Sequence, residues 1–244
     1  MAVVKFMGGF SRQSQAKRST AQLTFVTANH TGVGKTLLSC LVLSYLRSKG
    51  VQAAALKPFC SGSRSDVRHL MRHMDRHLDR DTINPWYNPL PVAPGAWKDP
   101  RSRQEVITHI DHIQARPDIQ HLIIEGAGGL LSPLGNHYHL GDLISHYQPR
   151  VILVLTQQLG VINQTLVHTH WLSQLPCPIK PHLVFMQPRR TDPSFESNLE
   201  VISRWLPDYP TTCLPYLGPK AMDPNRIQEH TTKLAAKLSE LFPI

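Results

Sequence analysis

The sequence predicts a single α/β domain in which a mainly parallel β-sheet carries helices on both faces. Two patterns predict it: short apolar, β-branched runs of strand length, and longer stretches with helical spacing between most of them. The length of 244 residues suits one such domain better than two. With 41% hydrophobic and 18% charged residues, the composition is globular and excludes collagen-like, coiled-coil and wholly disordered chains.

The expected strands are apolar at consecutive positions, as parallel strands buried on both faces should be. We expect them at residues 23–27, 53–57, 121–125, 151–156, 182–185 and 211–214. The expected helices lie at residues 35–48, 105–115, 162–173, 195–205 and 227–241. Residues 84–100 hold five prolines and two tryptophans, and we expect an ordered loop over the sheet edge or the active site.

Residues 1–20 contain four basic and no acidic residues. We expect a flexible basic extension there, with the domain spanning residues 21–244. No apolar run approaches the roughly 18 residues of a membrane-spanning helix, and residues 1–20 contain no secretory h-region. The four cysteines form no C-x-x-C pair, which argues against a zinc knuckle or a disulfide framework. We therefore expect a soluble cytoplasmic protein with free thiols.

The formal net charge of +9 favours anionic partners without choosing among nucleotide, nucleic acid and acidic metabolite. Arginines recur every four residues through 64–80, with histidines at 69, 73 and 77. One helix carrying them could hold a metal ion or a polyanion, but interleaved aspartates offer local ion pairs. We expect a solvated helix face.

We expect Trp86, Tyr87 and Trp97 to pack in the fold rather than stack on bases.

A glycine-rich segment joins the first expected strand to the first expected helix. Residues 27–36 read Thr-Ala-Asn-His-Thr-Gly-Val-Gly-Lys-Thr. Gly32 and Gly34 let backbone N–H groups turn toward phosphate oxygens at the helix N-terminus. Lys35 would reach the β- and γ-phosphates, and the Thr36 hydroxyl would ligate Mg²⁺. The segment predicts a P-loop NTPase-like fold, although Asn29 stands where a standard loop has its first glycine. A turn that only caps a helix is the alternative.

Two further strand ends carry chemical groups. Lys57 ends the second expected strand, and the carboxyl ends of parallel strands face the ligand crevice. Asp66 follows and could add a carboxylate for Mg²⁺. Glu125 ends the third strand before Gly-Ala-Gly-Gly, where an acid can hold Mg²⁺ and small residues admit a phosphate. A solvated lysine and a plain strand-terminal acid are the alternatives without function.

Together these segments resemble the dethiobiotin synthetase family. That family has T-G-x-x-T-x-V-G-K-T, then K-P-x-x-S-G, a downstream Asp, E-G-A-G-G, and V-I-L-V followed by L-G-x-I-N. The matching segments here are residues 27–36, 57–62, 66, 125–129, 151–154 and 159–163. The resemblance covers roughly residues 22–220, nearly the whole chain beyond the extension.

The resemblance implies an ATP-dependent cyclo-ligase of biotin biosynthesis that uses ATP and Mg²⁺. Its substrates would be 7,8-diaminopelargonate and CO₂, and its products dethiobiotin, ADP and phosphate, through a carbamate and a carbamic-phosphoric anhydride. The family also implies a homodimer with substrate at the subunit interface. Its partners would be small molecules, with no nucleic acid and no membrane.

The resemblance also assigns roles to single residues. Lys35 and Lys57 are the implied catalytic residues, and the implied metal ligands are Thr36, Asp66 and Glu125. The implied substrate contacts are Thr31, Ser61, Gly160 and Asn163. The implied nucleotide contacts are Gly32, Val33, Gly34, Lys35, Thr36, Leu37, Asp66, Glu125, Gly126, Ala127, Gly128, Gln187, Leu214, Pro215 and Tyr216. The helix start at residues 160–163 would receive the substrate's tail carboxylate from the partner subunit.

This chain departs from the family at several positions. Ala28 and His30 replace the family's Gly and Asp in the phosphate loop, and Gly95 follows Pro94 where the family has His. Gln187 stands near the place of an adenine-reading Asn.

Two other functions stay open. One is a related P-loop amidase or ligase acting on another carboxylate or amine, although the chain has no room for a glutaminase domain. The other is a nucleotide-switch binding module, supported only by the cationic segment 64–80.

Overall fold

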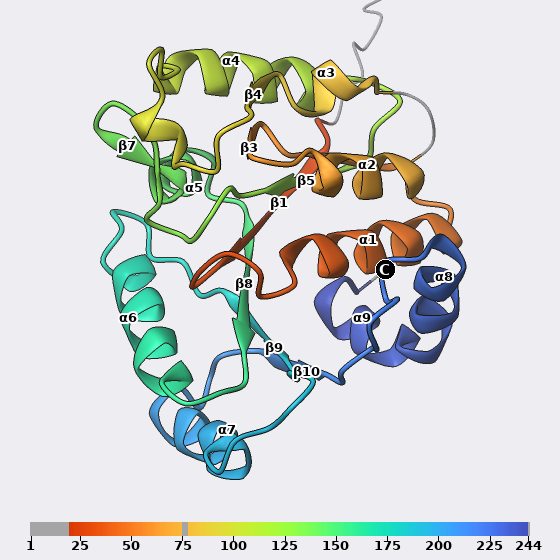
Figure 1. Ribbon diagram of the computed structural model, residues 1–244, viewed down its shortest axis with the longest axis vertical. Helices are drawn as coiled ribbons and strands as arrows, with labels where there is room; N and C mark the ends of the chain where they lie inside the picture. The colour runs from red at the N-terminus through yellow and green to blue at the C-terminus, as the bar shows by residue number, and fades with distance from the viewer. Residues whose placement is uncertain (1–19, 75–77, 244) are drawn as a thin grey trace, which may run out of the picture.

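Six parallel strands form the central sheet, in the order β10-β9-β8-β1-β5-β2 (Figure 1). The computed structural model describes residues 20–74 and 78–243, so the expected N-terminal extension lies outside the described residues except for residue 20. The strands are β1 (Gln22–Ala28), β2 (Ala53–Leu56), β5 (His121–Glu125), β8 (Arg150–Thr156), β9 (His182–Met186) and β10 (Thr211–Leu214). All six expected strands are confirmed, and every pairing among them is parallel.

The sheet is the centre of the hydrophobic core because its strands are apolar at consecutive positions. Residues 122–124 of β5 are at most 1% exposed, and residues 151–155 of β8 are at most 2% exposed. A strand with this pattern has no face that tolerates water, so both faces of the sheet must be covered.

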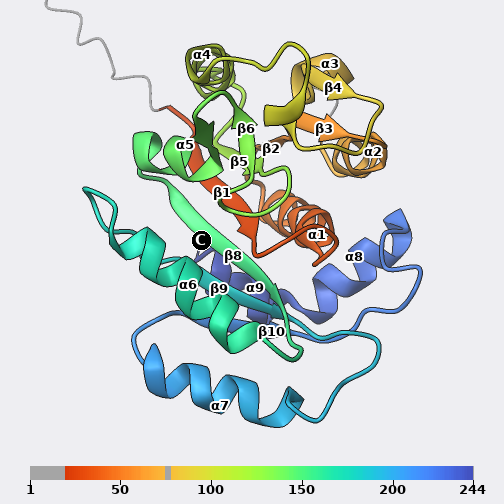
Figure 2. The ribbon, with the colours of Figure 1, turned by 60° about the vertical axis from the view of Figure 1, so that its left-hand side comes forward.

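Helices provide that cover. On one face lie α1 (Lys35–Ser48), α8 (Pro224–Lys233) and α9 (Ala235–Leu241), and on the other lie α5 (Leu140–Tyr147), α6 (Val161–Ser173) and α7 (Phe195–Trp205) (Figure 1 and Figure 2). Beside α5 runs α4 (Arg103–Gln114), where the Tyr147 hydroxyl donates to the Ile107 carbonyl at 3.1 Å. The predicted fold class is therefore confirmed.

Two helical expectations are wrong in detail. The helix expected at 227–241 is broken at Leu234, and the break lets α8 and α9 each turn an apolar face onto α1. The single helix expected through 64–80 is also not formed. Helix α2 (Ser65–Arg72) ends at Arg72, and α3 (Arg80–Ile83) begins only after Asp79, whose carboxylate caps the backbone N–H of Thr82 at 2.6 Å.

The arginine and histidine pattern through 64–80 is accordingly divided between two helices. Val67 and Leu70 are buried, while Arg68 and Arg72 are exposed, as expected of a solvated face. Among residues 20–74 and 78–243, no group of three or more His, Cys, Asp or Glu side chains could hold a metal ion. His77 lies outside the described residues.

The proline-rich segment carries more structure than a loop. In it, β4 (Trp86–Asn88) pairs in parallel with β3 (Phe59–Ser61), and a short 3-10 turn, η1 (Pro94–Ala96), follows. Phe59 packs against Trp86 and Trp97 at ring-centroid distances of 5.1 and 5.8 Å. Tyr87 is 38% exposed, and its hydroxyl donates to the Gly62 carbonyl at 2.8 Å. The expected packing is confirmed for Trp86 and Trp97, whereas the Tyr87 ring lies partly at the surface.

The connections of the sheet place a crevice at the carboxyl end of β1. From β1 the chain passes through α1 to β2 on one side, whereas after β5 it crosses to β8 on the other side. A reversal of this kind is where open α/β sheets bind ligands. Within the described part of the chain, no helix has the length and apolar character that crossing a membrane requires.

Candidate active site

The backbone turns sharply between the end of β1 and the start of α1. Gly32 and Gly34 have φ angles of +78° and +104°, in the left-handed region that glycine adopts most easily. Gly34 is also the N-cap of α1, and an added Cβ there would lie 3.1 Å from Met186 Cε. The segment therefore forms a tight turn that leads directly into the N-terminus of α1.

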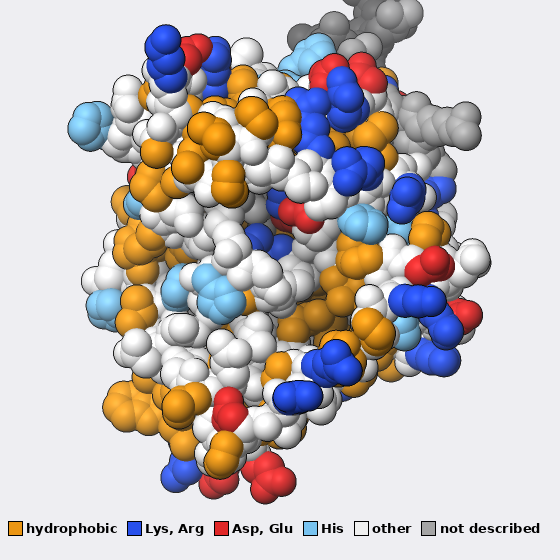
Figure 3. Space-filling model, in the orientation of Figure 1, with side chains coloured by type: hydrophobic (Ala, Val, Ile, Leu, Met, Phe, Trp, Pro, Cys, Tyr) orange, Lys and Arg blue, Asp and Glu red, His pale blue; other side chains and the backbone are white. Residues whose placement is uncertain are grey.

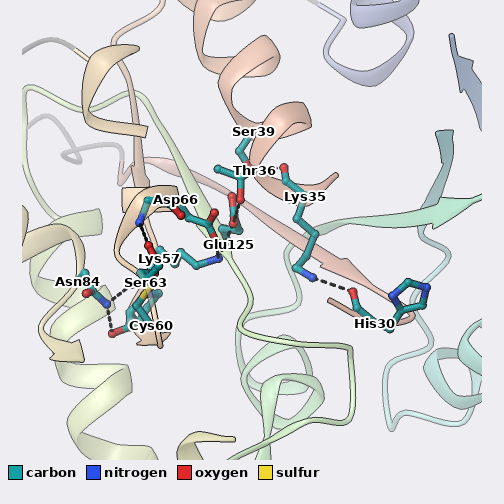
Figure 4. Close-up of polar contacts among 12 residues, drawn as sticks. His30, Lys35, Thr36, Ser39, Lys57, Cys60, Ser63, Asp66, Asn84 and Glu125 are labelled. Carbon is teal, nitrogen blue, oxygen red and sulfur yellow. Dashed lines mark hydrogen bonds and ion pairs between the residues drawn. The ribbon is translucent and has the colours of Figure 1, made fainter. Parts of the chain in front are cut away.

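Lys35 is the first residue of α1 and is only 6% exposed. Its ammonium turns back across the loop and donates to the His30 carbonyl at 3.0 Å (Figure 4). Burial and the nearby charge of Lys57 lower the pKa of Lys35 to about 8. The side chain is thus held against the backbone of the loop, at the wall of the cavity described below.

Lys57 follows β2 and is 5% exposed. Its ammonium lies 2.6 Å from Glu125 Oε1 and 2.9 Å from Asp66 Oδ2 (Figure 4). Burial by itself would lower the pKa of Lys57, but the charges and hydrogen bonds of Glu125 and Asp66 outweigh it and raise the pKa. Lys57 therefore stays cationic while almost fully removed from water.

Three oxygen-bearing side chains meet beside Lys57. The Thr36 hydroxyl donates to Glu125 Oε1 at 2.6 Å, and Asp66, on α2, pairs with the Lys57 ammonium. Glu125 is 1% exposed, and its Oε2 has no hydrogen-bond partner among the described residues. A buried carboxylate oxygen left without a partner fits a cation ligand, and hydroxyl and carboxylate oxygens suit Mg²⁺.

These groups border a cavity of about 710 Å³. Figure 3 shows it as a hollow with basic and acidic side chains at its floor. Eleven of the predicted site residues line it: Thr31, Gly32, Gly34, Lys35, Thr36, Leu37, Lys57, Ser61, Asp66, Ala127 and Gly128. Residues 91–94 of the proline-rich segment form part of its wall, which agrees with the expectation that this segment lies over the candidate site.

Other predicted site residues lie around the cavity rather than on its wall. Glu125 lies beneath it and is joined to it by Thr36 and Lys57. Val33 is 4% exposed, and an added Cβ at Gly126 would collide with Leu140 Cδ2, so the chain is closely packed at both positions.

The predicted nucleobase contacts lie at the ends of β9 and β10. The Gln187 N–H donates to the Leu214 carbonyl at 2.9 Å. Tyr216, two residues after Leu214, is 41% exposed. Met186 touches the phosphate loop at Gly34, so these strand ends flank the loop. Pro215 lies between them and is exposed.

Gly160 and Asn163 open α6 outside the cavity wall. Gly160 is the N-cap of α6 with φ +89°, and Asn163 is exposed. A side-chain hydrogen bond between Asn29 and Gln164 joins this end of α6 to the phosphate loop at 2.5 Å.

The cavity wall also contains residues that the sequence analysis did not assign. The added side chains are Phe59, Cys60, Ser65, His69, Pro91, Val92, Ala93, Pro94, Ser132 and Met222. Cys60 donates to the Ser63 carbonyl at 3.0 Å, and burial raises the pKa of its thiol. Burial and the charge of Arg72 lower the pKa of His69, which lies one helical turn after Asp66. The sequence marked His69 only as part of the histidine repeat at residues 69, 73 and 77 and gave no sign of its place on this cavity wall.

The sequence of this chain is similar to a known family and to several known proteins. A sequence family described as an AAA domain matches residues 22–205. An ATP-dependent dethiobiotin synthetase BioD from Endomicrobium trichonymphae is 28% identical over 186 residues, which cover 74% of this chain and 86% of that protein. The BioD of Bacillus velezensis is 32% identical over 160 residues, covering 62% of this chain and 68% of that protein. The chain belongs to the dethiobiotin synthetase family. The BioD of Idiomarina loihiensis is 27% identical over 208 residues, covering 79% and 92%.

Solved structures agree on the fold. The MinD cell division protein of Aquifex aeolicus superimposes with a TM-score of 0.51 at 12% identity, covering 88% of this chain and 97% of that one. A putative plasmid partition protein of Borrelia burgdorferi, bound to AMPPNP, gives a TM-score of 0.56 at 9% identity, covering 90% and 99%. This dethiobiotin synthetase family member therefore has a P-loop NTPase-like fold, and its family implies an ATP-dependent ligase acting on small molecules.

Proposed function

We propose that this protein is a dethiobiotin synthase, which uses ATP, Mg²⁺ and CO₂ to close the ring of 7,8-diaminopelargonate. One observation carries the proposal beyond family membership. Two buried lysines, Lys35 at the start of α1 and Lys57 after the end of β2, converge on one cavity that also holds Thr36 and Asp66. A site for joining two anions needs this combination of fixed cations and oxygen donors.

The proposed reaction proceeds in three steps. One amine of the substrate bonds to the carbon of CO₂ and loses a proton, which gives a carbamate. A carbamate oxygen then attacks the γ-phosphorus as the bond to the β-phosphate oxygen breaks, releasing ADP and leaving a carbamic-phosphoric anhydride. The second amine attacks the carbonyl carbon and loses a proton, the C–O bond to phosphate breaks so that phosphate leaves, and the cyclic urea of dethiobiotin forms.

Charge repulsion is the difficulty of the second step, because both the carbamate and the γ-phosphate are anions. Lys57 stays cationic in a site with little water, so it is suited to stabilise the carbamate and the transferring phosphoryl group. Lys35, at the head of α1, is suited to hold the β- and γ-phosphates. Coulomb interactions in such a buried site are several times stronger than in water.

Thr36, Asp66 and Glu125 are the proposed ligands of Mg²⁺. Bound there, the ion would neutralise phosphate charge and orient the β- and γ-oxygens. The hydroxyl of Thr36, the half-exposed carboxylate of Asp66 and the unpartnered oxygen of Glu125 support this assignment.

The remaining assignments concern recognition. Ser61 is proposed to contact the substrate, since its buried Oγ has no hydrogen-bond partner among the described residues. Thr31 lies on the same cavity wall. The start of α6 at Gly160 and Asn163 is proposed to bind the substrate's tail carboxylate in a homodimer. The four cysteines of this protein are free, which is in keeping with the proposal of a cytoplasmic enzyme.

The nucleobase is proposed to lie against the ends of β9 and β10. Gln187, Leu214, Pro215 and Tyr216 would contact it there. The backbone bond between Gln187 and Leu214 fixes the two strand ends at this place beside the phosphate loop.

A phosphate-release assay tests the proposal. Protein with Mg·ATP should release phosphate only when both diaminopelargonate and bicarbonate are present, and mass spectrometry should find dethiobiotin. Phosphate release that needs neither compound, or that nucleic acid stimulates, would favour a nucleotide switch. Phosphate release with a different amine or carboxylate would favour a related ligase.

A further inference from the structure

One hydrogen bond connects the phosphate loop to a helix on the opposite face of the sheet from α1. Asn29 Nδ2 donates to Gln164 Oε1 at 2.5 Å, and the two residues are 135 positions apart in the chain. Asn29 is the first residue after β1, at the position where a standard phosphate loop has glycine. Gln164 lies one turn into α6.

Gln164 is a rigid partner for the loop. Its backbone N–H donates to the Gly160 carbonyl at 3.2 Å, and its own carbonyl hydrogen bonds with the His168 ring at 2.6 Å. The neighbouring Val161 and Thr165 are fully buried, which fixes α6 against the sheet. The amide of Gln164 therefore starts from a backbone with little freedom to move.

The hydrogen bond to Gln164 can restrict the loop because the backbone of Asn29 is also in close contact with Gly129. Gly129 packs so closely that an added Cβ would lie 2.8 Å from the Asn29 carbonyl oxygen. The next carbonyl along, that of His30, accepts the hydrogen bond from Lys35 Nζ at 3.0 Å. A continuous series of contacts thus runs from Gln164 through Asn29 and His30 to the ammonium of Lys35.

We infer that Gln164 is a positioning residue for nucleotide binding, acting through the Asn29 side chain to fix the first turn of the phosphate loop. The loop lacks the glycine that would set this turn through its own backbone, and the amide pair supplies the constraint from outside. The inference rests on the proposed function, since it concerns how the same loop holds ATP.

Calorimetric titration with Mg²⁺ and the non-hydrolysable analogue AMPPNP tests this role. Asn29→Ala and Gln164→Ala should each weaken binding by about threefold to tenfold, the range expected for one lost side-chain hydrogen bond. The double variant should bind no more weakly than either single variant, because both remove the same contact. Gln174→Ala, at the other end of α6, should bind as the wild type does.

An exchange variant separates the hydrogen bond from general damage to the fold. Asn29→Gln with Gln164→Asn keeps the summed side-chain length and both amides, so affinity should return to within about twofold of the wild type. Multiplicative losses in the double alanine variant, or unchanged affinity in both single variants, would overturn the inference. Failure of the wild type to bind AMPPNP would overturn the proposed function together with it.

Discussion

The ammonium of Lys57 lies 2.6 Å from Glu125 Oε1 and 2.9 Å from Asp66 Oδ2, so a side-chain cation already pairs with both carboxylates that are proposed to hold Mg²⁺. The same Oε1 also accepts from Thr36 at 2.6 Å. Lys57 therefore balances the charge of the carboxylates before nucleotide arrives. A metal ion that enters alone must compete with that cation, whereas one that enters with phosphate brings compensating negative charge.

Lys57→Met should accordingly have two opposite effects. Turnover should fall by about a hundredfold or more, because the buried cation at the transferring group is lost. Affinity for Mg²⁺ without nucleotide should rise by about tenfold, because the carboxylates lose their competitor. Calorimetry with Mg²⁺ alone measures the second effect. Lys35→Met, which bonds neither carboxylate, is the matched control, and equal Mg²⁺ affinity in Lys57→Met and wild type would contradict the assignment.

Nucleotide affinity should fall as pH rises through about 8. The pKa of Lys35 in the free protein is lowered to about 8 by burial and by Lys57, so above that pH the amine loses the charge that phosphate requires. Binding must then take up a proton, which weakens affinity by up to about tenfold per pH unit. Titrations at pH 7 to 9.5 in buffers of different ionisation enthalpy measure both affinity and proton uptake. Lys35→Arg should remove this dependence, and a flat wild-type profile would count against it.

Gly34→Ala should damage both stability and nucleotide binding. Its φ of +104° and the 3.1 Å approach to Met186 Cε leave no room for a Cβ without strain, so we expect a loss of about 1–2 kcal/mol. Gly50→Ala is the control, since Gly50 has φ +79° with nothing within 4 Å of an added Cβ. Denaturant unfolding should show destabilisation in both variants, but only Gly34→Ala should lose AMPPNP binding. Normal binding by Gly34→Ala would show that the turn is not needed.

Low pH should lower the free energy of unfolding through His121, the first residue of β5. His121 is 6% exposed, hydrogen bonds with Thr24 Oγ1 at 2.9 Å and packs on Phe242, and burial together with Arg150 lowers its pKa to about 4. The folded protein resists protonation that the unfolded chain accepts near pH 6.5. Stability is therefore full above pH 6.5 and is lost as pH falls toward 4.

Between pH 8 and pH 5 this group should contribute a loss of about 2 kcal/mol. Urea unfolding at the two pH values measures it. His121→Gln should show a smaller loss over the same interval. If the two proteins lose the same amount of stability, His121 is not the group responsible.

Much of the sheet and the cavity floor could be predicted because their sequence signals are local. Consecutive apolar residues define β5 and β8, and the positive-φ glycines mark the turn before Lys35. The break at Leu234 could not be predicted, because both halves of 227–241 keep an apolar helical pattern and only packing on α1 separates them. Nor could the Asn29–Gln164 contact, which depends on how α6 lies in space.

The cavity wall was only partly predictable for a related reason. Cys60 and Pro91 meet at the cavity because β3 and β4 pair, and strands of three residues carry too little pattern to be found in the sequence. The expected loop over the active site is correct in position, but its pairing with β3 was missed.

The small β3–β4 sheet stands apart from the six-stranded sheet. The groups proposed to bind phosphate belong to the large sheet and its loops, whereas residues 91–94 follow from the small one. Sequence changes in this outer unit can therefore reshape the proposed space for an organic substrate while leaving the proposed phosphate-binding groups in place. Relatives with altered substrate range should therefore differ here first, and keep their lysines.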